Sequence, residues 1–161
     1  MKALNPTHID AVIKAINNGP FFRHLSIKVI EIGPGFSVVS MEIGKKHMNP
    51  FGGPHGGAYA SGIDTAAYWS AYCDLPEDRG LISIDLKVDF LAPVLHERTM
   101  IKGQRIKAGK TIYLTEAKML DMRGKLLAHG TSKLMVTRDK QSIEDVVAFM
   151  GSSKLPDKFL K

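Results

Sequence analysis

Residues 47–73 constrain the fold of this sequence most strongly, because a glycine-rich loop runs there directly into an alanine-rich segment. The loop contains two prolines, which lack an N–H, and four glycines, which adopt backbone angles that other residues avoid. It therefore cannot be regular secondary structure. The segment after it has small or apolar residues at spacings of three and four, which is typical of a helix. They are Ala60, Ile63, Ala67 and Ala71.

Asp64 is the acid inside this predicted helix, seven residues after Gly57. Seven residues are two turns, so the two share a face but lie roughly 10 Å apart along the axis. The free N–H groups and positive dipole end of a helix N-terminus favour a negative oxygen. A carboxylate base and such a donor must both lie about 3 Å from one reacting carbonyl. We therefore expect a two-fold dimer, in which Asp64 of one chain faces Gly57 of the other.

Asn49, the His-Gly-Gly run at 55–57 and Asp64 resemble, in type and spacing, the hotdog-fold acyl-CoA thioesterases of the phenylacetate-degradation (PaaI-like) type. The resemblance covers about residues 20–137. It implies the hotdog fold, a dimeric active site and hydrolysis of a thioester. Ser83, within Leu-Ile-Ser-Ile-Asp-Leu, matches a serine that some relatives place beside the attacking water.

The remaining pattern predicts an α+β hotdog fold, in which a curved antiparallel six-stranded sheet wraps around one long central helix. We expect one domain over residues 1–161, with an N-terminal helix at about 8–18, a core at about 20–137 and a C-terminal helix at about 143–150. Thr7 is the expected N-cap of the first helix, and Ser142 with Asp145 caps the last. The lysine-rich tail after it is expected to fray. The strand candidates are 25–32, 36–43, 81–90, 99–107, 111–121 and 125–137; that at 81–90 alternates regularly, and the central helix extends to about 74.

Composition indicates a cytoplasmic protein with no membrane partner. Hydrophobic residues make up 44% and charged residues 24%, as in ordinary globular proteins. Cys73 is the only cysteine, which excludes an internal disulfide and indicates a reducing compartment. The first residues lack the apolar core of a signal peptide, and no apolar run is long enough to span a membrane.

The net charge of +6 favours an anionic partner. The Lys and Arg residues are scattered and no aromatic residues alternate with them, so we expect no nucleic-acid partner. A phosphorylated small molecule such as coenzyme A fits the charge. Cations near hairpin ends are the candidates for its phosphates, with Lys107 and Arg123 foremost; the others are Arg105, Lys110 and Lys125.

Asp64 is expected to act as a general base on water or as a nucleophile, and the sequence leaves both open. Gly57 would donate its N–H to the thioester oxygen, with Gly56 shaping the turn and contacting substrate, although both glycines also suit a tight turn alone. His55 is expected to contact the substrate, although an isolated histidine in a loop is usually structural. Asn49 would orient water or the carbonyl.

Ser83 enters the site through the resemblance only. Tyr68 is the aromatic residue expected at the substrate, from a group that either shapes an acyl pocket or forms plain core: Tyr59, Tyr68, Trp69 and Phe90. Phe21 and Phe22 are expected to pack in the core or cover the sheet, with a role in lining the acyl pocket as the alternative.

Other chemistries are disfavoured. Gly52 and Gly57 have the spacing of a phosphate-binding loop, but Ala58 replaces its lysine. His47 and His55 have no Cys or acid at ligand spacing, so no metal is expected. Nucleophile-elbow and hotdog-hydratase patterns are also missing. We therefore expect a homodimeric or homotetrameric acyl-CoA thioesterase without a cofactor, coenzyme A being part of the substrate. A non-catalytic acyl-CoA-binding hotdog protein is the alternative, and a nucleic-acid-binding protein is a third.

Overall fold

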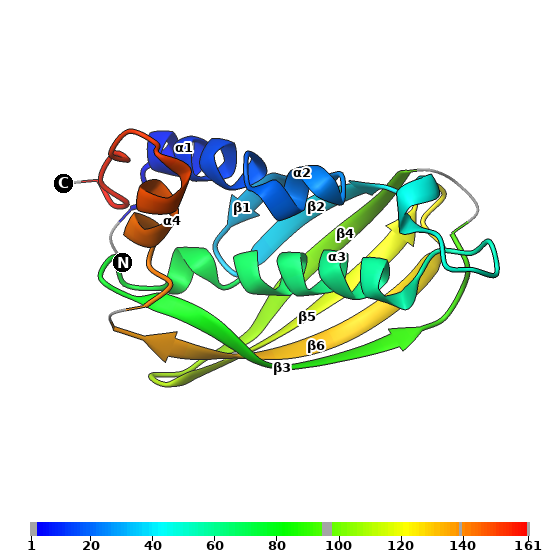
Figure 1. The fold of residues 1–161 in the computed structure, drawn as a ribbon. Helices are drawn as coiled ribbons and strands as arrows, with labels where there is room; N and C mark the ends of the chain where they lie inside the picture. The colour runs from blue at the N-terminus through cyan, green and yellow to red at the C-terminus, as the bar shows by residue number, and fades with distance from the viewer. Residues whose placement is uncertain (1–2, 95–97, 139, 161) are drawn as a thin grey trace.

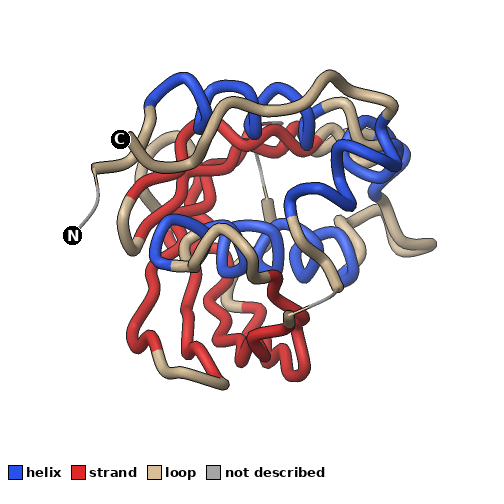
Figure 2. Tube along the Cα trace, turned by 90° about the vertical axis from the view of Figure 1, so that its left-hand side faces the viewer, coloured by secondary structure: helices blue, strands red, loops and turns tan. Residues whose placement is uncertain are grey.

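A computed structural model of the protein describes residues 3–94, 98–138 and 140–160, and six strands within them form one antiparallel sheet. The strand order is β1-β2-β4-β5-β6-β3. The sheet curves around the long helix α3 (Gly56–Trp69), as Figure 1 shows from the front and Figure 2 from the side. The predicted architecture is confirmed. The strands are β1 (Ile27–Gly33), β2 (Phe36–Glu42), β3 (Gly80–Phe90), β4 (Arg98–Ala108), β5 (Ile112–Asp121) and β6 (Leu126–Thr137).

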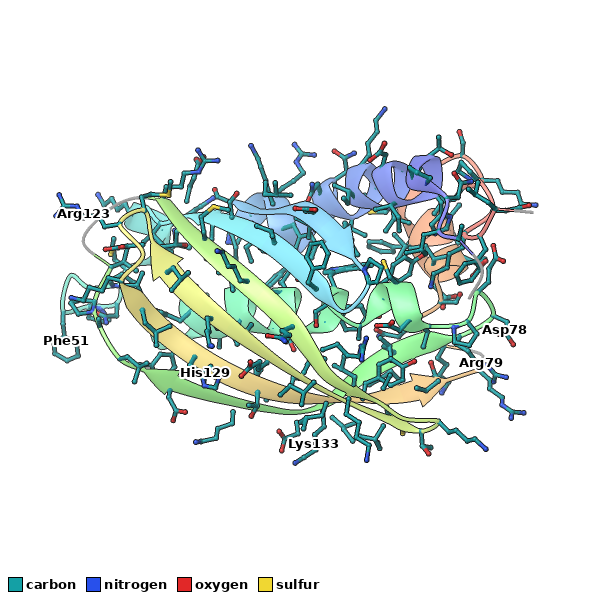
Figure 3. All side chains as sticks on the ribbon, turned by 180° about the vertical axis from the view of Figure 1, so that it is seen from behind. Phe51, Asp78, Arg79, Arg123, His129 and Lys133 are labelled. Carbon is teal, nitrogen blue, oxygen red and sulfur yellow. The ribbon has the colours of Figure 1, made fainter. Side chains whose placement is uncertain are left out.

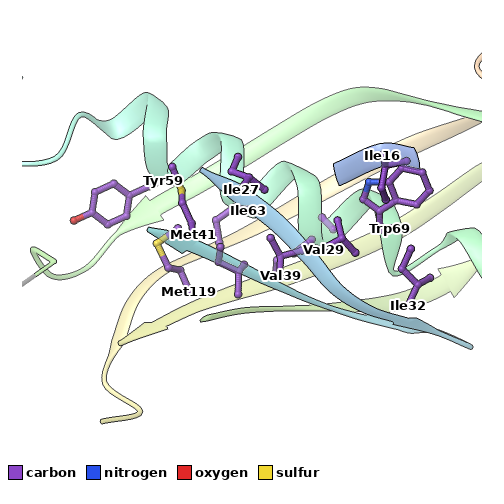
Figure 4. Close-up of a cluster of buried hydrophobic side chains, with 14 of the residues drawn as sticks. Ile16, Ile27, Val29, Ile32, Val39, Met41, Tyr59, Ile63, Trp69 and Met119 are labelled. Carbon is purple, nitrogen blue, oxygen red and sulfur yellow. The ribbon is translucent and has the colours of Figure 1, made fainter. Parts of the chain in front are cut away.

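The sheet approaches α3 closely because small residues lie at the contact. Gly103 of β4 faces the backbone of α3, where an added Cβ would overlap the carbonyl oxygen of Ala66. A Cβ on Gly130 of β6 would lie 2.5 Å from Ile63 Cγ2. Ile63 and Ala66 are fully buried, and Figure 4 shows part of the surrounding core. The helix that carries Asp64 is therefore held rigidly against the sheet.

Strand β3 departs from the regular alternation predicted for it. Its pairing with β6 shifts register between Ser83 and Asp85, so Ile84 is an extra, bulged residue and is 51% exposed. The strand lies at one edge of the sheet, where bulges are common because they interrupt pairing. Leu86 and Phe90 on the same strand are also exposed.

The N-terminal elements differ in detail from the prediction. Helix α1 (Pro6–Asn17) begins earlier than expected, with Asn5 as its N-cap, and Thr7 lies inside it. Pro6 is tolerated at the first helical position because that N–H has no helical partner in any case. A short helix α2 (Pro20–His24) follows that was not predicted, and its Phe21 is 57% exposed.

Helix α3 ends at Trp69, earlier than the predicted boundary near residue 74, and a 3₁₀ turn η2 (Tyr72–Asp74) follows it. Helix α4 (Ile143–Met150) has the predicted Ser142–Asp145 capping box. Among the described residues, no helix combines the length and the apolar character that crossing a membrane requires.

The expectation of a frayed tail is wrong. Leu4 and Phe159 form an antiparallel bridge, and Lys158 is only 2% exposed. Its Nζ donates to the carbonyl oxygens of Tyr72 and Leu75, each at 2.7 Å, and lies 4.0 Å from the centre of the Tyr72 ring. These carbonyl oxygens replace the water that the ammonium group loses on burial. Burial nevertheless lowers the pKa of Lys158 to about 8.

Candidate active site

The glycine loop before α3 is closed by its own hydrogen bonds. The Asn49 N–H donates to the Gly53 carbonyl at 2.7 Å, and the Asn49 side-chain oxygen accepts from the N–H groups of Phe51 and Gly53. Gly52 has a φ of +83°, which glycine adopts without strain. The Asn49 side chain, predicted to orient water or the carbonyl, therefore has its oxygen committed to the turn.

His55 is the N-cap of α3. Its Nδ1 accepts the Gly57 N–H at 2.8 Å, so a neutral ring carries its proton on Nε2. The donor predicted for the thioester oxygen is thus occupied by an exposed imidazole. The Gly56 N–H has no partner among the residues that the structure describes. His47, by contrast, is buried and bonds to backbone groups of Gly44 and Leu25.

Asp64 and Ser83 are brought together by the packing of α3 against β3. The Ser83 hydroxyl donates to Asp64 Oδ1 at 3.1 Å. Asp64 is half-buried, and desolvation raises its pKa above the usual value for aspartate, while the bond from Ser83 opposes that rise. A carboxylate with a raised pKa is a stronger base than an exposed one, so Asp64 is suited to accept a proton.

Tyr68 lies one turn further along the same face of α3. Its hydroxyl donates to the Leu81 carbonyl at 3.1 Å, and burial raises the pKa of Tyr68 to about 12. The phenol is therefore neutral and already hydrogen-bonded. It offers an apolar ring rather than a proton donor.

A cavity of about 880 Å³ lies between α2, the outer face of α3 and α4, and Asp64 lines it. Of the aromatic residues predicted to shape an acyl pocket, Tyr68 and Trp69 line this cavity. Tyr59 and Phe90 are not on its lining and pack edge-to-face with each other. Sequence reasoning gave Phe21 and Phe22 a role in lining the acyl pocket only as an alternative, and both line this cavity. It did not place α4 here, where Phe149 was the available signal.

The candidate cations for the coenzyme A phosphates lie in different parts of the structure. Arg105 forms an ion pair with Asp74, with Nε 2.7 Å from Oδ2, so its guanidinium already has a partner in the structure. Lys107 is exposed near the β4–β5 turn, and Arg123 is exposed at the β5–β6 turn, which is at the other end of the sheet. Figure 3 shows Arg123 at the same end of the molecule as Phe51 of the glycine loop. Across the described residues, no group of three or more His, Cys, Asp or Glu side chains is arranged to hold a metal ion.

Comparisons with known proteins give this chain a family and relatives. A family model described as "Domain of unknown function (DUF4442)" matches residues 11–136. "Acyl-coenzyme A thioesterase 13" of Homo sapiens is 29% identical over 125 residues, covering 74% of this chain and 87% of that protein. "1,4-dihydroxy-2-naphthoyl-CoA hydrolase" of Listeria monocytogenes is 24% identical over 117 residues, covering 73% and 95%.

Solved structures share the fold at low sequence identity. A thioesterase from Haemophilus influenzae superposes with a TM-score of 0.77 at 19% identity, covering 88% of this chain and 98% of that one. A thioesterase family protein from Silicibacter pomeroyi gives 0.74 at 22% identity, covering 81% and 98%. The predicted hotdog fold is therefore confirmed.

Proposed function

We propose, on the premise that this chain belongs to the DUF4442 family and has the hotdog fold, that it hydrolyses an acyl-CoA thioester to a free acid and coenzyme A. The names of the matched relatives support a thioester hydrolase. The observation that carries the proposal is the Asp64 carboxylate, which is held by Ser83 on the wall of an apolar cavity.

Asp64 would take a proton from water as that water attacks the thioester carbon. The C–S bond then breaks, and the coenzyme A sulfur leaves with a proton. Because the Ser83 hydroxyl holds Oδ1, Oδ2 is the oxygen proposed to face the water. Direct attack by Asp64 is the variant of this mechanism, and it would give an anhydride that water hydrolyses.

The thioester oxygen would meet the N-terminus of α3. The Gly56 N–H is available there, and the Gly57 N–H becomes available when the His55 ring rotates away. One such donor contributes about 3–4 kcal/mol to a transition state. Asp64 lies two turns from these amides on the same helix, so the carbonyl would be held by one subunit and attacked with the help of the other.

A homodimer, or a dimer of dimers, is supported by the exposed edge of the sheet. Among the described strands β3 pairs only with β6, and its Ile84 and Leu86 are 51% and 39% exposed. An uncovered strand edge with apolar side chains favours pairing with another chain. Arg123 is the cation proposed for the coenzyme A phosphates because it shares an end with the glycine loop, and Lys107 would contribute only from the second subunit.

Replacing the carboxylate tests the chemistry. Asp64→Asn keeps the shape of the side chain but removes the base, so kcat/KM measured by thiol release should fall at least about 10²-fold. The matched control is Asp85→Asn, because Asp85 lies on β3 near Ser83 but is exposed and paired with Lys133. Equal kcat/KM for Asp64→Asn and wild-type protein would refute the assignment.

Mixing two inactive variants tests the shared site. Gly56→Pro removes the N–H at the first helical position, where proline is favoured, and Gly56→Ala is its control with the N–H retained. Refolding Asp64→Asn with Gly56→Pro in equal amounts makes half the dimers mixed, and one of their two sites is intact. We expect about a quarter of wild-type activity. If no activity is recovered, the Asp64 carboxylate and the Gly56 N–H act in a site formed by a single chain.

A non-catalytic acyl-CoA-binding protein is the second candidate, because the His55 ring already occupies the Gly57 N–H. It predicts tight binding of acyl-CoA with no thiol release for any acyl group. Thiol release from any member of the substrate panel would exclude it.

A further inference from the structure

We propose that helix α4 is the specificity wall of the acyl site and that the preferred acyl group is a long, unbranched aliphatic chain. This inference rests on the proposed function. The family match ends at residue 136, whereas α4 spans Ile143–Met150. The wall is therefore an addition to the matched domain, and it faces the cavity in which Asp64 lies.

Helix α4 is fixed in position. Ile143 is 9% exposed and belongs to the main core, and Val146 packs against that core. The capping box at Ser142 and the left-handed Gly151 define both ends of the helix. Helix α4 therefore forms a fixed wall of the cavity, with Val146 and Phe149 on the lining.

The lining favours an apolar ligand. Phe21 of α2 and Phe149 of α4 are 57% and 77% exposed, although both border the cavity. An aliphatic chain between them would remove this apolar surface from water, and each buried methylene contributes about 0.8 kcal/mol.

The residues that line the cavity do not favour a polar acyl group. Besides Asp64, three charged residues of the described part of the chain line the cavity. Arg79 lies 3.4 Å from Asp78, Asp145 caps its own helix, and Lys140 is exposed. Within the described part of the chain, no buried side-chain nitrogen or oxygen lacks a hydrogen-bond partner. A polar acyl group would therefore lose its hydration without finding a buried partner.

The size of the cavity distinguishes a long chain from a single aromatic ring. A cavity of about 150 Å³ holds benzene, and the present one, at about 880 Å³, is roughly six times larger. An aromatic or short acyl group would leave most of it empty. A long chain extending from Asp64 toward α4 fills it.

The test is the chain-length profile of kcat/KM, measured by thiol release with saturated acyl-CoAs from butanoyl to palmitoyl. For wild-type protein we expect a rise of about fourfold per added methylene until the chain reaches α4, which is 0.8 kcal/mol converted at 1.4 kcal/mol per tenfold. Val146→Trp places an indole ring at the α4 side of the cavity, where the end of a long chain would lie, and should lower kcat/KM for palmitoyl-CoA at least tenfold more than for butanoyl-CoA. Phe149→Asp, at an exposed position that leaves folding intact, should act in the same direction.

Ala148→Trp is the matched control, because Ala148 lies on the same helix but is exposed and off the lining. Its profile should match that of wild-type protein. A profile that is flat in wild-type protein, peaks at an aromatic thioester, or keeps its shape in both α4 variants overturns the inference while thioester hydrolysis stands. Absence of thiol release for every acyl group overturns the proposed function and the inference together.

Discussion

Replacing Gly103 by alanine is the sharpest test of how the sheet holds α3. An alanine Cβ there would overlap the carbonyl oxygen of Ala66, lie 2.5 Å from its carbonyl carbon and 2.7 Å from Ser37 Oγ. These are two backbone atoms and a buried hydroxyl, so no flexible side chain can move aside. The helix must shift away from β4.

Two costs follow. Forcing an extra methyl group into a packed contact costs about 1–3 kcal/mol. Displacing α3 also breaks the bond from Ser37 Oγ to the Ala66 carbonyl, which is 2.7 Å long. Ser37 is 1% exposed, and leaving its hydroxyl without an acceptor costs about 1–3 kcal/mol more. We expect a loss of about 2–6 kcal/mol, which lowers Tm by roughly 5–20 °C.

Urea unfolding followed by circular dichroism, at one fixed protein concentration, measures this loss. Gly44→Ala is the control. Its Cβ would meet nothing within 4 Å, and its φ of −142° suits any residue. A change of less than about 0.5 kcal/mol for Gly103→Ala, the size of an ordinary surface substitution, would refute the claim that this contact is closely packed.

Three further outcomes follow from the charges. Burial raises the pKa of Asp64, so kcat/KM should fall with decreasing pH at a higher pH than for an ordinary aspartate; Ser83→Ala, which removes the opposing hydrogen bond, should move that limb of the profile higher still. The pKa of Lys158 is lowered to about 8 from 10.5, so between these pH values the unfolded chain binds more protons than the folded protein. The free energy of unfolding of wild-type protein, relative to that of Lys158→Met, should therefore rise by up to about 3 kcal/mol from pH 8 to pH 10.5. A difference that does not change with pH would contradict the burial of this lysine. Arg105→Gln should cost about 1 kcal/mol of stability by removing the partly exposed pair with Asp74, without raising KM for acyl-CoA, and a raised KM would return Arg105 to the coenzyme A candidates.

The order of elements was predictable because the apolar periodicities are long and their boundaries are marked by glycine and proline. The bulge at Ile84 was not, since Ile82, Ile84 and Leu86 alternate perfectly in sequence and only the pairing with β6 shifts them. A single strand does not reveal the register that its neighbour imposes.

In the candidate site, the resemblance placed Ser83 beside the attacking water, and its hydrogen bond to Asp64 came from the structure alone. The hydrogen bond from the Gly57 N–H to His55 Nδ1 could not be predicted, because it depends on the side-chain rotamer of His55 at the start of the helix. The cavity was also beyond the sequence. Its walls come from α2 and α4, which are more than a hundred residues apart, and neither shows by itself that its aromatic residue borders a cavity.

The pairing between the two ends of the described chain bears on the order in which the protein matures. Ala3 accepts from the Leu160 N–H and Asn5 donates to the Lys158 carbonyl, each at 2.9 Å, and Asn5 also bonds Asp157 across a separation of 152 residues. The Nδ1 atom of His8, in α1, lies 2.6 Å from the carbonyl oxygen of Pro156. During synthesis on the ribosome, residues 3–8 emerge well before residues 156–160, which hold their hydrogen-bond partners. Residues 3–8 therefore cannot complete these hydrogen bonds until residues 156–160 have been made, and they would stay open to proteases until then.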